Sequence, residues 1–357
     1  MVAVAPPPCY IILMEQLNDR YSRQTLFQHI GEGRQKILMN SSAVVIGCGA
    51  LGTVSSSYLT RAGIGQIRII DRDFIEESNL QRQILFDEND ISENLPKAIA
   101  AQRKLQKINT KIKIEGIVSD INYSNIDELT KDVDIIIDGT DNFETRFLIN
   151  DYCVKNSVPW IYGACIGSRG LVMNIIPSET PCLRCVFETM PQIGSFPTCD
   201  TAGVIGPIAG IIASIQVTEA IKILTKDYVS VNKKLLEIDV WDTKFKQIDI
   251  SEFKEGNNCP TCKLHNYKFL EAEDGIMTTF LCGKNAVQVM SRNAGNIDLE
   301  QLEHRLGPIT DVSRNAFMLK FKIKNHEFTV FPDGRAIITG TADSSTARNL
   351  YSKYLGM

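Results

Sequence analysis

The chain has 357 residues, of which 44% are hydrophobic and 22% charged, and its formal net charge is −4 at pH 7. This composition predicts a soluble protein with a large core and two or three domains. The mild negative charge and the lack of a Lys/Arg-rich run argue against nucleic acid as a partner. The cysteines include two Cys-x-x-Cys pairs, which indicate a metal in a reducing compartment, so we expect a cytoplasmic protein.

Two stretches could be targeting or membrane-spanning segments. The first, Met1–Leu13, is proline-rich and lacks the positive start and long apolar run of a signal peptide, so we expect residues 1–16 to form a disordered tail. The second, Gly203–Leu224, approaches membrane-spanning length but contains Pro207, Gln216, Glu219 and Lys222. We therefore predict a buried helix and no membrane partner.

The stretch from Ser42 to Asp71 predicts a strand, a glycine turn, a helix and a second strand. Gly47 allows the tight turn, Gly49 lets the backbone approach a phosphate, and Gly52 lets the helix pack closely on the strand. The free N–H groups at the helix N-terminus attract an anion.

Asp71 ends the second strand, at a position where an acidic residue binds a ribose hydroxyl. The pattern therefore predicts nucleotide binding. It does not identify the nucleotide, because dehydrogenases, methyltransferases and nucleotidyl-transfer enzymes share it.

Strands and helices alternate along the chain up to about residue 165. Hydrophobic spacing predicts further helices over 28–39, 96–108, 144–156 and 203–224, and further strands over 112–118, 133–137, 160–164, 171–176, 235–240 and 243–250. The alternation predicts a doubly wound parallel sheet, and the short connections after it predict antiparallel strands.

A separate unit is expected from Gly275 onward. It offers strands over 278–282, 286–290, 317–323, 326–331 and 336–339, with helices over 299–306 and 345–355. Asp333-Gly334 predicts a hairpin turn between the last two strands. We therefore expect the tail over 1–16, a nucleotide-binding domain over 17–270 and a small C-terminal domain over 275–357.

The two cysteine pairs predict a closed tetrahedral Zn²⁺ site. Each pair presents two thiolates from one tight turn, and the ligands would be Cys182, Cys185, Cys259 and Cys262. The alternative is that the same residues are buried or disulfide-linked. His265 follows the second pair as a further candidate ligand, although four thiolates already fill the shell.

Several other residues are candidates for chemistry. Cys199 lies before the apolar helix, where a helix N-terminus would lower its pKa, although an isolated loop cysteine can also be incidental. Arg82 and Lys97 follow the strand that ends in Asp71 and could reach a triphosphate, and Asp141 could hold Mg²⁺ or face the α-phosphate. The alternative for each charged residue is a solvated surface ion.

The motifs together resemble the ThiF/MoeB/HesA adenylyltransferases, which are relatives of the ubiquitin-activating enzymes. The resemblance covers roughly residues 17–265 and rests on motifs that follow one another in the family's order. These are Arg20-Tyr21-Ser22-Arg23-Gln24, the glycine turn, Asp71-x-Asp73, Ser78-Asn79-Leu80-Gln81-Arg82-Gln83, Pro96-Lys97, Asp138-Gly139-Thr140-Asp141-Asn142, both cysteine pairs and Cys199-Asp200-Thr201-Ala202-Gly203-Val204. Ala50 departs from the family, since many members have a third glycine there.

The resemblance implies a Rossmann-like, mainly parallel sheet extended by antiparallel strands, and ATP with Mg²⁺ at its glycine turn. By motif, Asp71 would hold the ribose, Asn79, Arg82 and Lys97 would bind the triphosphate, and Asp141 would assist Mg²⁺ and the α-phosphate. Arg23 would reach into the site of the partner subunit in a homodimer. The nucleotide-binding set implied by the motifs is completed by Gly47, Gly49, Ala50, Gly52, Asp73 and Gln83.

The implied activity is adenylation of the C-terminal glycine of a small ubiquitin-like sulfur carrier ending in Gly-Gly, for thiamine or molybdopterin biosynthesis. A sulfur donor such as a cysteine desulfurase or a persulfide would follow, with Cys199 accepting the activated carrier or taking part in sulfur transfer. Two alternatives remain open, namely an NAD-dependent oxidoreductase and a non-catalytic scaffold for a ubiquitin-like protein. The C-terminal unit lacks the cysteine-headed loop of a rhodanese domain.

Overall fold

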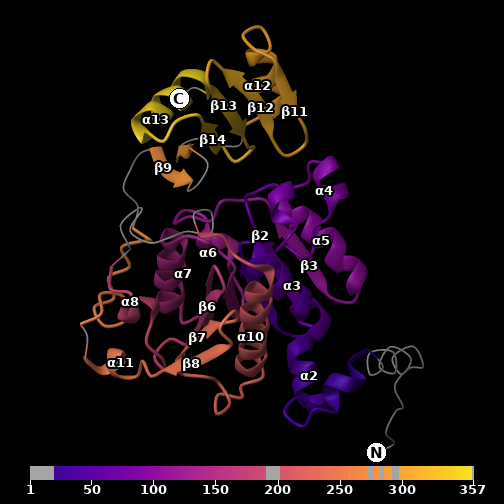
Figure 1. Cartoon of the computed structure of the whole chain (residues 1–357), viewed down its shortest axis with the longest axis vertical. Coiled ribbons are helices and arrows are strands. Elements are labelled where there is room, and N and C mark those ends of the chain that lie inside the picture. Colours follow the sequence, from indigo (N-terminus) through magenta and orange to yellow (C-terminus); the bar gives the residue numbers. More distant parts are fainter. Residues whose placement is uncertain are drawn as a thin grey trace, which may run out of the picture. The chain divides into compact units, whose positions relative to one another are not determined.

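The computed structural model describes residues 20–189, 202–256, 258–271, 276–281, 285–291 and 297–355 (Figure 1). The expected N-terminal tail and Cys199 lie outside these residues. The chain divides into two compact units, one built on an eight-stranded sheet and one on a six-stranded sheet. Each unit is described by itself.

The sheet of the first unit has the order β3-β2-β1-β4-β5-β6-β7-β8. Its first five members are parallel, and they are β1 (Ser42–Ile46), β2 (Gln66–Ile70), β3 (Lys113–Ile117), β4 (Ile135–Asp138) and β5 (Trp160–Ile166). The antiparallel extension consists of β6 (Arg169–Ile175), β7 (Leu235–Asp239) and β8 (Lys244–Ile248). The predicted mainly parallel sheet with antiparallel strands added at one edge is confirmed.

Helices cover both faces of this sheet. On one face lie α3 (Ala50–Ala62), α5 (Lys97–Ile108) and α10 (Gly206–Leu224), and on the other lie α6 (Ile126–Leu129), α7 (Phe143–Asn156) and α8 (Leu183–Val186). Val45 packs in the core on the face covered by α3, α5 and α10, whereas Val44 and Ile46 pack in the core on the face covered by α6, α7 and α8. Successive β1 side chains thus enter two cores, which explains the continuous apolar run in the sequence.

Helix α10 is long and apolar enough to span a membrane by length and composition alone. It lies instead beside α3 and packs on β5 and β6 (Figure 1). Its polar residues serve this packing, since buried Gln216 donates to the carbonyl oxygens of Asp138 and Ile161. The predicted buried helix is therefore the observed one.

The second unit is an antiparallel sheet with the order β11-β12-β13-β14-β10-β9. Its strands are β9 (Ile276–Leu281), β10 (Ala286–Ser291), β11 (Val312–Arg314), β12 (Leu319–Ile323), β13 (His326–Val330) and β14 (Ala336–Thr339). The helices α12 (Leu299–Leu306) and α13 (Ser344–Leu355) contribute Leu302, Leu306 and Tyr351 to its core.

Some boundaries differ from the sequence predictions. The helix expected over 28–39 begins three residues later, as α2 (Gly31–Met39), because Gly31 has a φ of 58° and turns the preceding chain away. The short elements η1 (Glu77–Asn79), α4 (Glu88–Ser92), α11 (Glu252–Gly256) and β11 were not predicted. They are too short for a periodic pattern to reveal.

Candidate functional site

The glycine turn joins β1 to α3 at the carboxyl edge of the parallel strands. Gly47 has a φ of 88°, and a Cβ there would lie 2.6 Å from the carbonyl oxygen of Gly139. A Cβ on Gly52 would lie 1.9 Å from the carbonyl oxygen of Gly47. Within the described part of the chain, a Cβ on Gly49 would have its nearest contacts at 3.9 Å, with Gln83 Nε2 and the carbonyl oxygen of Gly139. This leaves space for a ligand at the helix N-terminus, where half-buried Ala50 begins α3.

Asp71 is fixed beside this turn. Its carboxylate accepts hydrogen bonds from the backbone N–H groups of Cys48 and Asp73. Burial raises the pKa of Asp71, and the positive charge of Lys97 opposes that rise. A carboxylate anchored by backbone donors at the end of β2 is suited to accept hydrogen bonds from ribose hydroxyls.

Lys97 begins α5 and is buried near the carboxylates of Asp71 and Asp73. Its Nζ lies 3.1 Å from Asp73 Oδ2. Burial alone would lower the pKa of Lys97, but the charges of Asp73 and Asp71 outweigh it and keep the pKa above its ordinary value. Lys97 is therefore a permanent cation at physiological pH, as triphosphate binding requires.

The segment around η1 carries three of the predicted residues. Asn79 is buried, and its Oδ1 accepts a hydrogen bond from the backbone of Glu76. Arg82 is half-buried and donates to the carbonyl oxygen of Ser78 at 2.7 Å. Gln83 is 3% exposed, and its Oε1 has no hydrogen-bond partner within the described part of the chain. Because its Nε2 faces Gly49, this unpaired amide fits a ligand bound over the glycine turn.

Asp141 is exposed on the loop that follows β4. Its negative charge contributes to raising the pKa of Lys97, Arg72 and Arg146, which places it in the same electrostatic neighbourhood. The edge that holds the glycine turn therefore also holds the predicted acidic and basic residues from β2, η1, α5 and the β4–α7 loop.

Arg23 does not lie at this edge. It is exposed on a helical segment whose neighbours Tyr21 and Gln24 bind Asn109 and the carbonyl oxygen of Ala62. Ala62 is the last of the 13 residues of α3, so about 20 Å of helix separates it from the glycine turn. Arg23 therefore belongs to the opposite edge of its own sheet.

The structure brings the four predicted zinc ligands together. Their sulfur atoms all lie within 4.8 Å of one another. The Sγ–Sγ distances are 3.8 Å for Cys182–Cys185, 3.5 Å for Cys182–Cys259 and 3.4 Å for Cys185–Cys262, too long for disulfides. Four thiolates bound at about 2.3 Å to a tetrahedral Zn²⁺ lie roughly 3.8 Å apart, so the cluster could hold this metal.

Neighbouring polar groups fix both cysteine turns. Asn150 accepts the backbone N–H of Leu183 at 2.8 Å, and Thr261 donates to Asp151 at 2.7 Å. His265 lies outside the cluster, and its Nδ1 pairs with the hydroxyl of Tyr267. Because their sulfur atoms lie too far apart for S–S bonds, the alternative of a disulfide-linked set is wrong for these four residues.

Sequence reasoning missed two arginines at the site, of which Arg146 is buried and Arg72 is half-buried. Arg72 lies 2.7 Å from Asp120, and Arg146 lies 3.0 Å from Asp138. The available signal was an arginine next to an acidic residue at a strand end, or on the helix that follows it. Both signals are common on protein surfaces, so they do not reveal burial.

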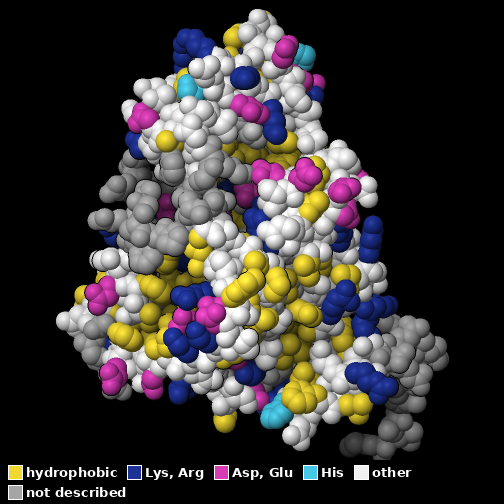
Figure 2. All heavy atoms as spheres, in the orientation of Figure 1, with side chains coloured by type: hydrophobic (Ala, Val, Ile, Leu, Met, Phe, Trp, Pro, Cys, Tyr) yellow, Lys and Arg dark blue, Asp and Glu magenta, His cyan; other side chains and the backbone are white. Residues whose placement is uncertain are grey.

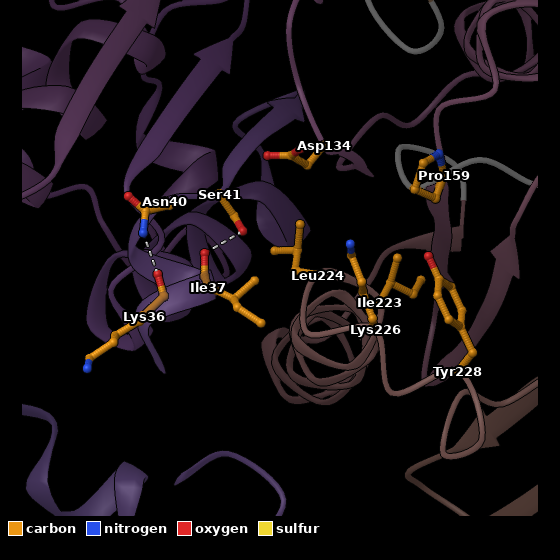
Figure 3. A pocket seen from close by; sticks show the side chains of 10 residues that line it. All are labelled: Lys36, Ile37, Asn40, Ser41, Asp134, Pro159, Ile223, Leu224, Lys226 and Tyr228. Atoms are coloured by element: carbon orange, nitrogen blue, oxygen red, sulfur yellow. Dashed lines mark hydrogen bonds between the residues drawn. The ribbon is translucent and has the colours of Figure 1, made fainter. Parts of the chain in front are cut away.

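A separate pocket of about 490 Å³ lies at the other edge of the sheet (Figure 3). Its lining includes Ser41, Asp134 and Pro159, which directly precede the first residues of β1, β4 and β5. Ligands of such sheets bind at the carboxyl ends of the strands. This pocket is therefore distinct from the candidate nucleotide site.

The fold and these residues together define a Rossmann-like nucleotide-binding protein. The profile of the ThiF family matches residues 21–261, and the chain belongs to this family. A Bacillus subtilis protein named sulfur carrier protein ThiS adenylyltransferase is 41% identical over 341 residues, which cover 95% of this chain and 100% of that protein. A Haloferax volcanii protein named SAMP-activating enzyme E1 is 34% identical over 244 residues, covering 68% and 88%.

Solved structures of a related enzyme share the fold of the first unit. Escherichia coli MccB with ATP matches with a TM-score of 0.59 and 27% identity, over 69% of this chain and 74% of that chain. The relatives described above are named as adenylyltransferase or activating enzyme. They favour the predicted adenylation over the oxidoreductase and scaffold alternatives.

Proposed function

We propose that the protein uses ATP to adenylate the C-terminal glycine of a small ubiquitin-like sulfur carrier ending in Gly-Gly, for thiamine or molybdopterin biosynthesis. The proposal rests above all on the glycine turn, where Asp71 and Lys97 meet at the edge that also carries Gln83. The sulfur-carrier substrate is supported by the name of the Bacillus subtilis relative.

The residues of this edge divide the work of binding ATP. The glycine turn and the N-terminus of α3 receive phosphate through backbone N–H groups. Asp71 accepts the ribose hydroxyls, while Arg82, Lys97 and Asn79 bind the triphosphate. Asp73, which borders Lys97, and Gln83 complete the binding set.

Adenylation needs charge stabilisation and alignment more than acid–base catalysis. The carrier carboxylate is already a nucleophile; it attacks the α-phosphorus, and pyrophosphate leaves. Bound Mg²⁺ would supply neutralising charge, with Asp141 as its carboxylate. Lys97 and Arg82 stabilise negative charge on the phosphates as it redistributes.

The second metal in the proposal is a structural Zn²⁺ bound by Cys182, Cys185, Cys259 and Cys262. The tetrahedral spacing of the sulfur atoms supports it, and the four thiolates leave no open position for substrate. Zinc would join the start of α8 to the turn at Cys259, which are 77 residues apart.

A homodimer would give Arg23 its site. The distance of Arg23 from its own glycine turn supports a role in the partner subunit. Figure 2 shows apolar side chains over α3 and α10. Tyr58 belongs to α3 and is 48% exposed. Leu26 and Phe27, close to Arg23 in sequence, are 72% and 56% exposed and would be covered in the dimer.

After adenylation, we propose that the thiolate of Cys199 attacks the acyl carbon, which forms a thioester and releases AMP. The outer sulfur of a persulfide, such as one carried by a cysteine desulfurase, would then displace the Cys199 thiolate and form an acyl disulfide. Attack of a thiolate on the donor's sulfur would break the S–S bond, release the carrier thiocarboxylate and leave the donor in a disulfide that cellular thiols reduce. The described chain resumes at Ala202, and Val204 pairs with Gly167 just beyond β5, at the carboxyl edge. A reducing cytoplasm would keep these thiols active.

Carrier-dependent exchange between ATP and labelled pyrophosphate tests the proposed function. We expect exchange with a carrier ending in Gly-Gly and none with the same carrier lacking its last glycine. Mass spectrometry should detect one AMP on the intact carrier. NAD reduction without any carrier-dependent exchange would contradict the proposal.

A further inference from the structure

Arg146 is a buried cation in α7, directly behind the loop that carries Asp141. Its side chain is 6% exposed, and its Nε lies 3.0 Å from Oδ2 of the fully buried Asp138. Its Nη2 donates to the carbonyl oxygens of Thr140 at 2.6 Å and Gly163 at 3.0 Å. One guanidinium therefore ties the loop after β4 to its neighbouring strand β5.

Further hydrogen bonds, made by Asp138 and by Gly139, hold the same loop in place. Asp138 Oδ1 accepts the backbone N–H of Thr140 at 2.9 Å and its hydroxyl at 2.6 Å. The N–H of Gly139 donates to Ile46 at 2.8 Å, and a Cβ on Gly139 would lie 2.4 Å from the carbonyl oxygen of Gly47. The loop is thereby locked against the glycine turn.

The guanidinium of Arg146 makes more directional contacts than filling this space would require. Arg146 lies over the rings of Tyr162 and Phe143, at 5.1 and 5.6 Å from their centroids. An apolar side chain could fill this environment without the cost of burying a charge pair. The planar guanidinium adds simultaneous bonds to one carboxylate and two carbonyl oxygens, which fix the direction of the loop.

We propose that Arg146 is a positioning residue for adenylation, because its guanidinium holds residues 138–141 so that Asp141 faces the nucleotide edge. This inference rests on the proposed function of the site. Arg146 itself need not touch ATP or the carrier. It acts through the backbone of Thr140, one residue before Asp141.

The informative substitution is Arg146→Lys. Lysine keeps the positive charge that Asp138 needs, but its single ammonium cannot reproduce the flat, three-acceptor geometry. Arg68→Lys is a matched control, since Arg68 also bridges a carboxylate, Glu115, and two carbonyl oxygens, those of Leu129 and Lys131. Arg68 lies on β2 and binds the segment before β4, away from the Asp141 loop.

Two readouts separate positioning from stability. In nucleotide-free Arg146→Lys, the amide of Thr140 should exchange its hydrogen at least about tenfold faster than in the wild type. The kcat of pyrophosphate exchange should fall at least about tenfold, while the KM for ATP changes less than about threefold. Arg68→Lys should change neither the hydrogen exchange of the Thr140 amide nor the kcat of pyrophosphate exchange by more than about twofold.

Thr140→Val provides a second test should Arg146→Lys not fold. It removes the hydroxyl bond to Asp138 and leaves the ion pair, so a smaller change in the same direction is expected. Unchanged exchange at residue 140 in the folded variants, or an equal loss of kcat in Arg68→Lys, would overturn the inference. If no carrier supports exchange in the wild type, the proposed function fails, whereas the amide measurement still decides whether Arg146 holds the loop.

Discussion

Lys97 and Asp73 are joined twice, since Lys97 Nζ lies 3.1 Å from Asp73 Oδ2 and the Lys97 backbone N–H donates to the Asp73 carbonyl oxygen at 2.9 Å. The ammonium is almost fully buried, whereas the carboxylate is half exposed. A bound triphosphate would therefore meet a cation already held in position, and Asp73 could return to solvent when phosphate replaces it.

Lys97→Ala and Arg82→Ala should each abolish adenylate formation and leave the fold intact. Both side chains compensate phosphate charge and contribute little apolar packing. Carrier-dependent pyrophosphate exchange measures the loss, and circular dichroism checks the fold. Lys104→Ala is the control, because Lys104 lies on the same helix but pairs with Asp87 and Asp90. Wild-type exchange in both site variants would remove the proposed triphosphate site.

Asp73→Asn should move the alkaline limit of ATP binding to lower pH. Burial lowers the pKa of Lys97, and Asp73 contributes most to the opposing rise. Without the Asp73 charge, Lys97 loses its proton at a lower pH, so ATP affinity should decline earlier as pH rises. Dissociation constants measured between about pH 7 and 10.5 test this. Asp87→Asn should leave the profile unchanged, and superimposable profiles for Asp73→Asn and wild type would contradict the prediction.

The sequence predicted the glycine turn and the sheet because their physical requirements are local. Gly47 and Gly52 occupy positions where a Cβ would collide with backbone, and the apolar run ending at Ile46 is buried on both faces. The cysteine pairs could also be interpreted from the sequence. A four-thiolate metal site requires the two pairs to come together, regardless of the conformation of the chain between them.

Other features depend on tertiary structure that no local pattern contains. Arg146 and Asp138 pair across a loop and a helix turn, and Arg146 also reaches Gly163 on the next strand. Arg23 shares a motif set with the nucleotide residues, yet it lies at the far end of α3. Its distance from the site follows from the hydrogen bond that Gln24 donates to the carbonyl oxygen of Ala62, a contact between residues far apart in the sequence.

Each chain should contain one Zn²⁺, and Cys262→Ser should lose it. Metal binding is coupled to folding, so the thermal midpoint should fall by roughly 5 °C or more. Elemental analysis and thermal unfolding decide this. Cys165→Ser is a control, since Cys165 is also half-buried and lies outside the cluster. A metal-free wild-type protein of normal stability would rule out the site.

Mixing inactive Arg23→Ala and Asp141→Ala chains should restore activity if Arg23 acts in the partner subunit. Random exchange makes half of the dimers mixed, and each mixed dimer has one intact site, so about a quarter of wild-type activity is expected. Lys97→Ala mixed with Asp141→Ala should recover none, because both residues serve the same site. Absence of recovery in the first mixture, with exchange shown by differently tagged chains, would mean that Arg23 does not act across the dimer.

Cys199→Ser should separate adenylation from sulfur transfer. Its position after Pro197-Thr198 and before the apolar helix, and its match to the Cys-x-x-Ala-Gly motif, support a nucleophilic role. Pyrophosphate exchange should stay near the wild-type rate, because the carrier carboxylate attacks ATP without help from a thiol. The covalent carrier adduct on a non-reducing gel should disappear, together with thiocarboxylate formation in a reconstituted assay.

The controls for Cys199 distinguish three chemical routes. Cys165→Ser should retain both the adduct and thiocarboxylate formation, since Cys165 lies within β5 and has no assigned role in sulfur transfer. If Cys199→Ser forms thiocarboxylate at the wild-type rate, the acyl-adenylate passes directly to an external persulfide and Cys199 has no role in that transfer. If pyrophosphate exchange itself collapses, Cys199 contributes to the ATP site or to the fold, because a residue that acts only after AMP is attached cannot limit the reversal of that step.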